Sequence, residues 1–402
     1  MDNGERVLIR EAIWTRSFVF VCLSNLAILA NVHTIMPTLP LYVSTIGSSE
    51  KVIGFVIGVF PITAMALRPV VGMLLDKFGR KVLLFLGVAM TALICGSYIL
   101  ASTLMLLILA RFLHGVAFSL SHTAIGTVAV DVLPPKRLGQ GIGYFGLTSS
   151  ISMAIAPAVG LWMAEKNGFF PLFLLSTSLA VLALILSFIA TYGTDERNTI
   201  KKATIDKGLS WSDFVEIKAI PASIIVGLIA MLFGAVVTIL VLFANQNGIA
   251  NIGIFFTVNA LAMIISRPLA DGWCNKKGER VVMLGGAAML ALCVFIITLS
   301  NNINHIIIAG VFYGLGLGFC IPVLQTMAIR DVLPQRRGAA TGNFYSAFDL
   351  GIGAGAIIWA WIGAVIGYRW AFLLNLVPIS LAGILYCYFY IRKLSIDNEQ
   401  KP

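Results

Sequence analysis

The chain has 402 residues, of which 59% are hydrophobic and 11% are charged, and its net charge is +10. The charged fraction is roughly half that of an average soluble domain, and a soluble protein of this length must still cover itself with polar surface. The composition therefore excludes an ordinary water-soluble protein and predicts one that is solvated by lipid. The six cysteines lie mostly in apolar runs without CxxC spacing, so they are interpreted as apolar core residues.

Twelve apolar runs follow one another along the chain, each about 20 residues long, which is the length of a helix that spans a bilayer. Runs this long and uniform are not barrel strands, so we predict an all-α membrane protein with twelve transmembrane helices. The run that begins at Phe18 is too long for a signal peptide and is interpreted as the first span. The expected spans lie near residues 18–42, 52–75, 82–101, 104–129, 138–163, 169–191, 219–244, 249–270, 281–300, 303–329, 338–363 and 369–391.

The two halves of the chain repeat one another. The segment from Arg68 to Lys81 has a weaker copy that begins at Arg267, 199 residues later (267 − 68 = 199), and the same interval relates Gly79 to Gly278. Repetition on this scale indicates that one unit was used twice. We therefore predict two pseudo-symmetric six-helix bundles, residues 1–191 and 219–402.

A polar linker, residues 192–218, joins the predicted bundles and is interpreted as a tether. Its Trp211 and Phe214 are expected to form a short amphipathic helix at the membrane surface. Most Lys and Arg residues lie in the two tails, the linker and the even-numbered loops, whereas the opposite loops hold only Lys51, Lys166 and Arg369. This distribution places both termini and the linker in the cytoplasm, and it explains the positive net charge without a nucleic-acid partner.

The loop after the second predicted span combines small and charged residues at close spacing. Gly72 would let a neighbouring helix approach closely, and Gly79 would supply the positive φ of a tight turn. The carboxylate of Asp76 could meet Arg80 or a helix N-terminus, with Lys77 beside it. We interpret the loop as a cytoplasmic latch, and the alternative is that its charges only anchor it in the cytosol. In the second copy Asp271 replaces the first glycine and Glu279 replaces the arginine, so that copy is interpreted as degraded.

Charged and imidazole groups lie on one stripe of the fourth predicted span. His114, Phe118 and His122 follow Arg111 at spacings that place all four on one face of a helix. A charge at this depth costs at least roughly 2.5–3.5 kcal/mol, so it should face protein or water. Arg111 and His114 are candidate proton-coupling residues. The alternatives are a structural arginine bonded to carbonyl groups and packed, hydrogen-bonded histidines.

Asp349 is the only carboxylate well inside a predicted span, and its counterpart in the first half is Ser150. A carboxyl group that alternates between wet and dry surroundings can load and release a proton. Asp349 is therefore a candidate for proton coupling or cation binding, and the alternative is a structural acid that makes hydrogen bonds.

Further polar and aromatic residues inside the spans are candidates for a substrate cavity, although each alone could equally join two helices. Pro157 and Pro322 predict bends in the fifth and tenth spans. The candidate cavity residues are Asn25, His33, Phe118, His122, Asn259, Gln325, Asn343 and Tyr345.

Several short motifs give the chain a resemblance to a known family. The loop motif is Gly72-x-x-x-Asp76-Lys77-x-Gly79-Arg80-Lys81. The fourth span contains Leu107-x-x-x-Arg111-x-x-His114-Gly115, with His where Gln is often found, and the fifth contains Ala156-Pro157-x-x-Gly160, with Ala where Gly usually precedes Pro. Pro37-x-Leu-Pro40 and Asp331-x-x-Pro334-x-x-Arg337-Gly338 complete the set. Over nearly its whole length the chain resembles a major facilitator superfamily transporter, and in particular the drug:proton antiporter-1 group.

The resemblance implies a multi-pass secondary transporter of the cytoplasmic membrane whose bundles rock about a midplane site. We expect a monomer without a cofactor or metal that exports a small amphipathic organic compound, cationic solutes included, in exchange for protons. An importer or facilitator of a small metabolite is the alternative. A membrane-embedded enzyme or sensor, with His114, His122 and Asp349 converging on a metal, is a third hypothesis.

Overall fold

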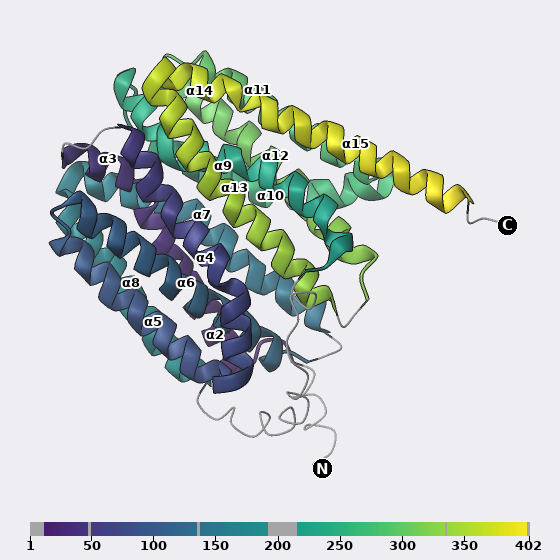
Figure 1. The fold of residues 1–402 in the computed structure, drawn as a ribbon, viewed down its shortest axis with the longest axis horizontal. Helices are drawn as coiled ribbons and strands as arrows, with labels where there is room; N and C mark the ends of the chain where they lie inside the picture. The colour runs from purple at the N-terminus through teal and green to yellow at the C-terminus, as the bar shows by residue number, and fades with distance from the viewer. Residues whose placement is uncertain (1–11, 47–49, 135–136, 192–214, 334–335, 400–402) are drawn as a thin grey trace, which may run out of the picture. The chain divides into compact units, whose positions relative to one another are not determined.

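The computed structural model describes residues 12–46, 50–134, 137–191, 215–333 and 336–399, and the regular structure in these ranges consists of helices (Figure 1). Ten helical segments are long and apolar enough to cross a bilayer. Two shorter apolar segments lie within α4 (Glu50–Phe78) and α10 (Gly253–Lys277). The twelve segments correspond in order to the twelve predicted spans, so the predicted all-α membrane fold is confirmed.

The remaining helices follow the predicted spans closely. In the first half they are α2 Arg16–Ile35, α3 Leu39–Thr45, α5 Arg80–Ser97, the 3-10 helix η1 Tyr98–Leu100, α6 Leu104–Val132, α7 Leu138–Asn167 and α8 Phe169–Thr191. In the second half they are η5 Ile217–Ala219, α9 Ile220–Gln246, α11 Glu279–Thr298, α12 Ile303–Arg330, α13 Arg337–Ile366, α14 Tyr368–Leu374 and α15 Leu376–Glu399.

The first and last predicted spans are each divided into two helices. Between α2 and α3 the chain turns before Pro40, which occupies the first turn of α3, where its fixed φ and missing N–H are tolerated. Between α14 and α15 the division falls at Asn375. The amphipathic helix expected at Trp211 and Phe214 lies outside the described residues.

The contacts divide the chain into two compact units. Unit 1 comprises Met1–Ile35 and Leu67–Leu209, and unit 2 comprises Met36–Ala66 and Ser210–Pro402. Helix α4 is therefore shared, and the division falls between its two prolines, Pro61 and Pro69. Because proline lacks the N–H that a helix interior needs, the two halves of α4 are less firmly tied to each other than those of an ordinary helix. The predicted six-plus-six division at 1–191 and 219–402 stays a prediction.

Small residues bring the helices of unit 1 together. Helix α2 packs against α7 and α8, and α5 packs against α6 and α8. A Cβ atom at Gly87 of α5 would lie 2.8 Å from the Cβ of Leu120 on α6, and one at Gly160 of α7 would lie 3.0 Å from the Cγ2 of Thr34 on α2. These helices approach more closely than larger side chains would allow. Gly160 follows Pro157, which lies inside α7, by three residues.

Unit 2 repeats this packing. Helix α9 packs against α13, and α11 packs against α12. A Cβ atom at Gly286 of α11 would lie 2.9 Å from the Cβ of Phe319 on α12. These two residues stand at the repeat interval from Gly87 and Leu120 (286 − 87 = 199; 319 − 120 = 199). The duplication predicted from the sequence is therefore also present in the contacts between helices.

A glycine-rich run in α13 allows two further close contacts within unit 2. A Cβ atom at Gly353 would lie 2.5 Å from the Cγ1 of Ile62 on the first half of α4, and one at Gly355 would lie 2.7 Å from the Cα of Met231 on α9. Figure 1 shows α9 and α13 side by side. Helix α13 therefore packs closely against α4 and α9, and a larger residue at Gly353 or Gly355 would displace these neighbours. Pro322 lies inside α12, and the bend predicted there stays a prediction.

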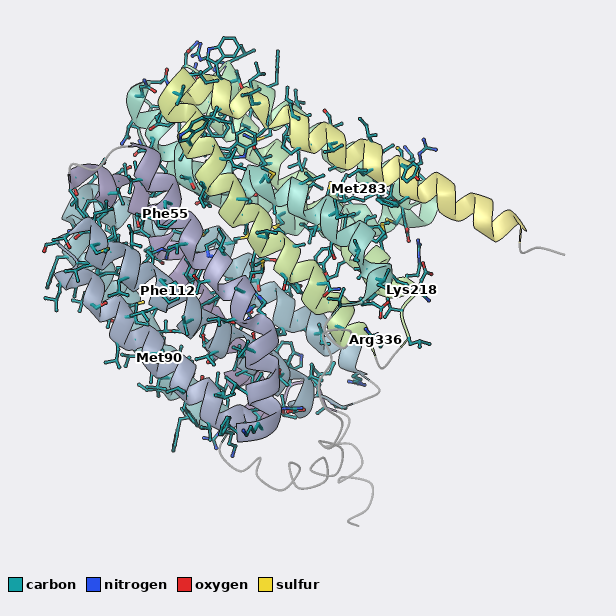
Figure 2. The ribbon with its side chains drawn as sticks, in the orientation of Figure 1. Phe55, Met90, Phe112, Lys218, Met283 and Arg336 are labelled. Atoms are coloured by element: carbon teal, nitrogen blue, oxygen red, sulfur yellow. The ribbon has the colours of Figure 1, made fainter. Side chains whose placement is uncertain are left out.

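Large apolar side chains are exposed on the outer surface of the helices. Leu93, Leu100 and Met105 are 75%, 75% and 76% exposed, and Phe112, labelled in Figure 2, is 46% exposed. Soluble proteins do not expose apolar residues on this scale. Because lipid tails accept such surface, the exposed residues identify the face that meets the bilayer.

We predict that Gly286→Val lowers the thermal stability of the purified protein by the equivalent of about 1–3 kcal/mol, because the new side chain would overpack the contact with α12. The matched control is Gly285→Val on the same helix, since no described atom lies within 4 Å of a Cβ at Gly285. Thermal unfolding in detergent measures both variants. Equal destabilisation by the two substitutions would contradict the close contact.

Candidate functional site

The loop between α4 and α5 carries the motif that was predicted to act as a latch. Gly79 precedes α5 with a φ of 88°, so the predicted positive φ is confirmed. Arg80 forms an ion pair with Asp131 in the last turn of α6. Among the described residues nothing lies within 4 Å of a Cβ at Gly72, so no close neighbour occupies that position in this conformation. Lys77 is exposed and lies over the ring of Phe78.

The side chain of Asp76 lies outside the described part of the structure, so its predicted contact stays a prediction. The partner that the structure gives to Arg80 was not foreseen. Asp131 was missed because it stands 51 residues further along the chain (131 − 80 = 51) and belongs to no local motif.

Unit 2 contains the same ion pair with its charges exchanged. Glu279 at the start of α11 accepts a hydrogen bond of 2.9 Å from Arg330 at the end of α12. These residues stand at the repeat interval from Arg80 and Asp131 (279 − 80 = 199; 330 − 131 = 199). The second copy was interpreted as degraded because Glu279 replaces an arginine, and at this position that interpretation is wrong. Both members of the pair changed sign together, so the attraction is retained.

The exchange places the two pairs differently with respect to the helix dipoles. A helix N-terminus favours negative charge and a C-terminus favours positive charge, by about 0.3–1 kcal/mol per residue. Glu279 and Arg330 both follow this rule, whereas Arg80 at the N-terminus of α5 and Asp131 at the C-terminus of α6 both oppose it. The pair in unit 1 is therefore the weaker of the two and the easier to separate.

A buried network of hydrogen bonds surrounds Arg111 in unit 1. Arg111 and His114 are both 0% exposed. The guanidinium of Arg111 interacts with the hydroxyl of Tyr98, which lies 3.0 Å from Nδ1 of His114. The other ring nitrogen, Nε2, lies 3.9 Å from the Sγ of Cys95. Both nitrogens of the predicted coupling residue His114 therefore have partners in the protein.

The network continues through Cys95 to α2 and α8. The thiol of Cys95 donates to Oδ1 of Asn31 at 3.6 Å, and Nδ2 of Asn31 donates to Oγ and to the carbonyl oxygen of Ser176, both at 2.7 Å. Each of these side chains is 0% exposed. The network thus joins α2, α5, η1, α6 and α8 in a region where an unpaired polar group is costly. Cys95 is therefore a hydrogen-bonding residue and not only an apolar one.

The predicted stripe on α6 is buried as far as Phe118 and partly exposed at His122. The ring of His122 is stacked on that of Phe118, with centroids 4.9 Å apart, and Nδ1 of His122 makes no hydrogen bond to any described residue. Nδ1 of His33 on α2 lies 2.9 Å from the hydroxyl of Ser152 on α7. The charge of Arg68 on α4 and the ring of His33 both act electrostatically on His122. His33, Arg68 and His122 are partly exposed, unlike Arg111 and His114.

Arg68 begins the repeated segment but was not among the predicted site residues. It lies at the end of the apolar segment Val52–Arg68 inside α4, whereas Arg111 lies inside the segment Leu104–Val132, so the depth argument singled out Arg111 alone. Asn25, another predicted cavity residue of unit 1, donates a hydrogen bond of 2.7 Å to the hydroxyl of Thr148 and is buried.

In unit 2 the predicted polar residues are spread over several helices. Nε2 of Gln325 on α12 donates to the hydroxyl of Tyr345 on α13 at 3.3 Å. Asn259 on α10 is 1% exposed, and its Oδ1 accepts no hydrogen bond from a described residue. Asp349 on α13 is partly exposed and lies four residues before Gly353, which packs against α4, and six before Gly355, which packs against α9. Arg111 belongs to unit 1 and Asp349 to unit 2.

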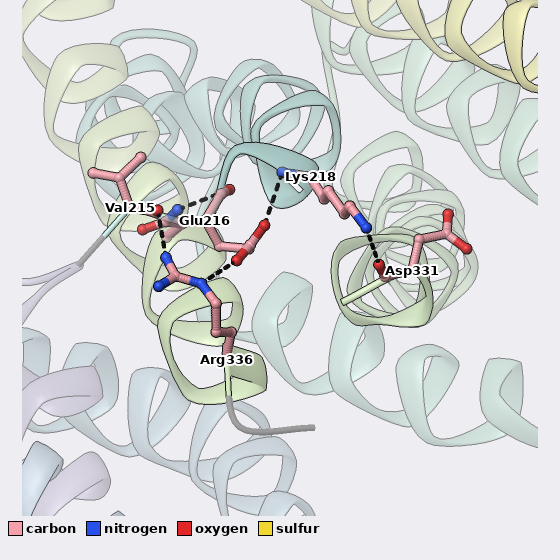
Figure 3. Close-up of polar contacts among 6 residues, drawn as sticks. Val215, Glu216, Lys218, Asp331 and Arg336 are labelled. Atoms are coloured by element: carbon pink, nitrogen blue, oxygen red, sulfur yellow. Dashed lines mark hydrogen bonds and ion pairs between the residues drawn. The ribbon is translucent and has the colours of Figure 1, made fainter. Parts of the chain in front are cut away.

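The residues that precede α9 are held to the start of α13 by a group of polar contacts (Figure 3). Nε of Arg336 donates to Oε2 of Glu216 at 2.6 Å, and its Nη2 donates to the carbonyl of Val215 at 2.9 Å. Nδ2 of Asn343 donates to the carbonyl of Glu216 at 3.3 Å, and Nζ of Lys218 donates to the carbonyl of Asp331 at 3.0 Å. The structure therefore gives Asn343, predicted as a cavity residue, a partner at the end of the linker.

The same contacts act on the ionisation of Glu216. The hydrogen bond from Arg336 and the one from the backbone N–H of Lys218 lower the pKa of the Glu216 carboxyl below its ordinary value, because both favour the charged form. The carboxylate thus joins the residues that precede α9 to the start of α13. Nothing in the sequence marked Glu216, since it lies at the end of a polar linker among other charged residues.

Comparison with known proteins gives one family for nearly the whole chain. A family model described as Major Facilitator Superfamily matches residues 21–250 and 222–401. The Staphylopine export protein of Staphylococcus aureus is 28% identical over 353 residues, which cover 84% of this chain and 86% of that protein. The Multidrug resistance protein MdtG of Yersinia enterocolitica is 23% identical over 407 residues, which cover 96% of each chain.

Solved structures with the same fold include the nucleoside transporter NupG, with a TM-score of 0.71 and 15% identity over 94% of this chain and 99% of that one. A POT family transporter in complex with a thioalcohol-conjugated peptide has a TM-score of 0.78 and 12% identity, and the match covers 94% of this chain and 96% of that one. At these identities the likeness shows the fold alone.

We predict that exchanging the charges of the unit 1 pair, Arg80→Glu with Asp131→Arg, raises the thermal stability, because both charges would then favour their helix dipoles. The same exchange in unit 2, Glu279→Arg with Arg330→Glu, should lower stability by about 0.5–2 kcal/mol from two such dipole effects. Thermal unfolding in detergent at low ionic strength measures both double variants, since salt screens these effects. If the two exchanges shift stability in the same direction, the helix dipoles do not distinguish the pairs.

A second prediction follows from the pKa of Glu216. A carboxyl group with a lowered pKa in the folded state stabilises the protein above its unfolded-state pKa, and this contribution is lost as the pH falls through the folded-state pKa. Glu216→Gln should therefore be less stable than the parent protein at pH 7, and the difference should shrink as the pH falls below about 4. Thermal unfolding across this pH range measures it, with Glu165→Gln as an exposed carboxylate control. A difference that stays constant with pH would contradict the assigned interaction.

Proposed function

The chain belongs to the Major Facilitator Superfamily, and we propose that it exports a small amphipathic organic compound in exchange for protons. Membership of this family makes the protein a multi-pass membrane transporter and not an enzyme. The observation that carries the proposal of export is the similarity, over 84% and 96% of the chain, to two proteins named for export and for multidrug resistance.

The physical requirements of the proposed exchange are modest. One elementary charge crossing about 150 mV releases roughly 3.5 kcal/mol, which supports a solute gradient of a few hundred-fold. In an alternating-access cycle two halves of the molecule would move about a midplane site, and each face would open in turn. A carboxyl group must meet water on one side, release its proton and then be enclosed again.

Asp349 is the residue that we propose for this role. It is a carboxylate well inside a predicted span, it is partly exposed on α13, and it precedes a segment that α4 and α9 hold tightly. A small movement of α13 against those helices would change how much water reaches the carboxyl group. Arg111 and His114 are supporting candidates for coupling, although their complete burial in the unit 1 network favours their structural role.

The ion pair between Arg80 and Asp131 is proposed to work as the latch of the cycle. Its charges oppose the dipoles of α5 and α6, so it can break and reform at low cost. The proposal includes the cytoplasmic orientation of this loop and of both termini, which follows from the distribution of Lys and Arg. It also includes action as a monomer and the cytoplasmic membrane as the location.

We predict that Asp349→Asn abolishes proton-driven transport but leaves proton-independent exchange of solute across the membrane. Proteoliposomes with an acidic lumen measure the first activity, and counterflow at equal pH on both sides measures the second. Asp349→Glu, which keeps the carboxyl group, should retain part of the proton-driven flux.

The sign of the gradient separates the proposed function from its alternative. An antiporter accumulates solute in an acidic lumen, a proton symporter accumulates it when the outside medium is acidic, and a facilitator only equilibrates it. Undiminished accumulation by Asp349→Asn in an acidic lumen would remove this residue from the coupling mechanism.

A further inference from the structure

Large apolar side chains are exposed along one face of α11. Val281, Leu292 and Phe295 are 44%, 41% and 51% exposed, and at 100° per residue they lie within about 60° of one another around the helix axis. The helix has 20 residues, which at 1.5 Å per residue is about 30 Å, the thickness of the hydrocarbon core. This face is therefore covered by lipid, and α11 begins at one surface of the bilayer.

The turn that precedes α11 concentrates positive charge at that surface. Helix α10 ends at Lys277 and α11 begins at Glu279, with Gly278 between them at a φ of 84°. The side chains of Lys276, Lys277 and Arg280 are all exposed. Three cations thus lie within five consecutive residues, in a turn that directly adjoins the lipid-covered face of α11.

The ion pair of unit 2 does not use any of these three cations. Glu279 is the acidic residue of the turn, and its carboxylate accepts a hydrogen bond of 2.9 Å from Arg330 at the end of α12. In unit 1 the corresponding ion pair takes Arg80, which is one of the bases of the α4–α5 loop itself, and joins it to Asp131. The exchange of charges between the two pairs therefore leaves the turn of unit 2 with three cations that its own carboxylate does not neutralise.

An aromatic ring lies beside these cations. Trp273 in the last turns of α10 is 37% exposed, and its ring is 5.5 Å from that of Phe319 on α12, measured between centroids. Nζ of Lys277 lies over the same ring, 5.3 Å from its centroid. Tryptophan is enriched at the level of the lipid headgroups, and a lysine stem lies along apolar surface while its ammonium reaches those headgroups. The turn therefore lies where lipid phosphates lie.

We propose that Lys276, Lys277 and Arg280, beside the ring of Trp273, bind the headgroup of an anionic phospholipid whose acyl chains lie along the exposed face of α11. Basic residues at the bilayer surface attract anionic lipids, and the planar guanidinium of Arg280 matches two oxygens of a phosphate. A zwitterionic headgroup fits less well, because its own cationic group is repelled by the three cations. The inference goes beyond the proposed export function, since it concerns the surface that meets lipid and not the path of the solute.

Three ligands test the site. Phosphatidylglycerol is anionic, phosphatidylcholine with the same acyl chains is zwitterionic, and glycerol-3-phosphate has an anionic phosphate but no chains. Binding to the purified full chain in a non-ionic detergent is measured by native mass spectrometry and by thermal unfolding. We expect phosphatidylglycerol to bind at least about tenfold more tightly than phosphatidylcholine, since each cation near an anionic headgroup contributes about fivefold. Glycerol-3-phosphate should not stabilise the protein at the concentration at which phosphatidylglycerol does.

Variants then locate the preference. Lys276→Gln with Lys277→Gln should reduce it at least about fivefold, whereas Lys276→Arg with Lys277→Arg, which keeps both charges, should retain it. The matched control is Lys166→Gln with Arg369→Gln, which removes two exposed cations elsewhere and should leave the preference unchanged. Arg280→Gln should weaken the preference by a further several-fold when it is added to the first pair of substitutions.

Four results would overturn the proposal. These are equal affinity for phosphatidylglycerol and phosphatidylcholine, equal stabilisation by glycerol-3-phosphate, a preference that survives Lys276→Gln with Lys277→Gln, and an equal loss of preference in the control variant. The last result would show that the net charge of the protein, and not this turn, selects the lipid. None of these measurements requires a transported solute, so the proposed export can fail while this site stands.

Discussion

The absence of water from the bilayer core is the constraint on which the rest of this structure depends. It requires every backbone group to be bonded within its own segment, which helices achieve, and it makes each buried charge costly unless the protein surrounds it with partners. In unit 1 the guanidinium of Arg111 has Tyr98 as a partner, and from Tyr98 a network of hydrogen bonds extends to Ser176. Arg111 is 0% exposed, and hydrogen bonds of this kind offset the cost of burying its charge in the interior of unit 1.

Duplication shapes the architecture, and departures from it mark the candidate functional residues. The close contact between Gly87 and Leu120 recurs between Gly286 and Phe319 because both units bring equivalent helices together. Arg111, by contrast, has Gly310 as its counterpart, and that glycine packs against Phe255. The ion pairs at the ends of α6 and α12 show a third possibility. The contact is present in both units, but the positions of the acidic and the basic residue are exchanged. Because helix dipoles favour only one of the two arrangements, the pairs differ in strength.

The fold could be predicted because its determinants are local and repeated. Apolar runs of spanning length gave the twelve spans, and the interval between Gly79 and Gly278 gave the duplication. Contacts between distant residues could not be predicted: Asp131 and Arg330 were missed as ion-pair partners, and Asn343 bonds the end of the linker. The α6 stripe was placed correctly on one face, but helical periodicity cannot show that His114 is enclosed while His122 is partly exposed, because exposure depends on the neighbouring helices.

The difference between the enclosed and the accessible polar groups is the claim on which this account of the protein depends. It is tested most directly by thiol labelling of single cysteines, introduced as His114→Cys and His122→Cys in a chain whose six natural cysteines have been replaced. The account predicts that a membrane-impermeant thiol reagent labels the cysteine at position 122, while the cysteine at position 114 remains unlabelled in the folded protein. Equal labelling of the two positions would contradict it.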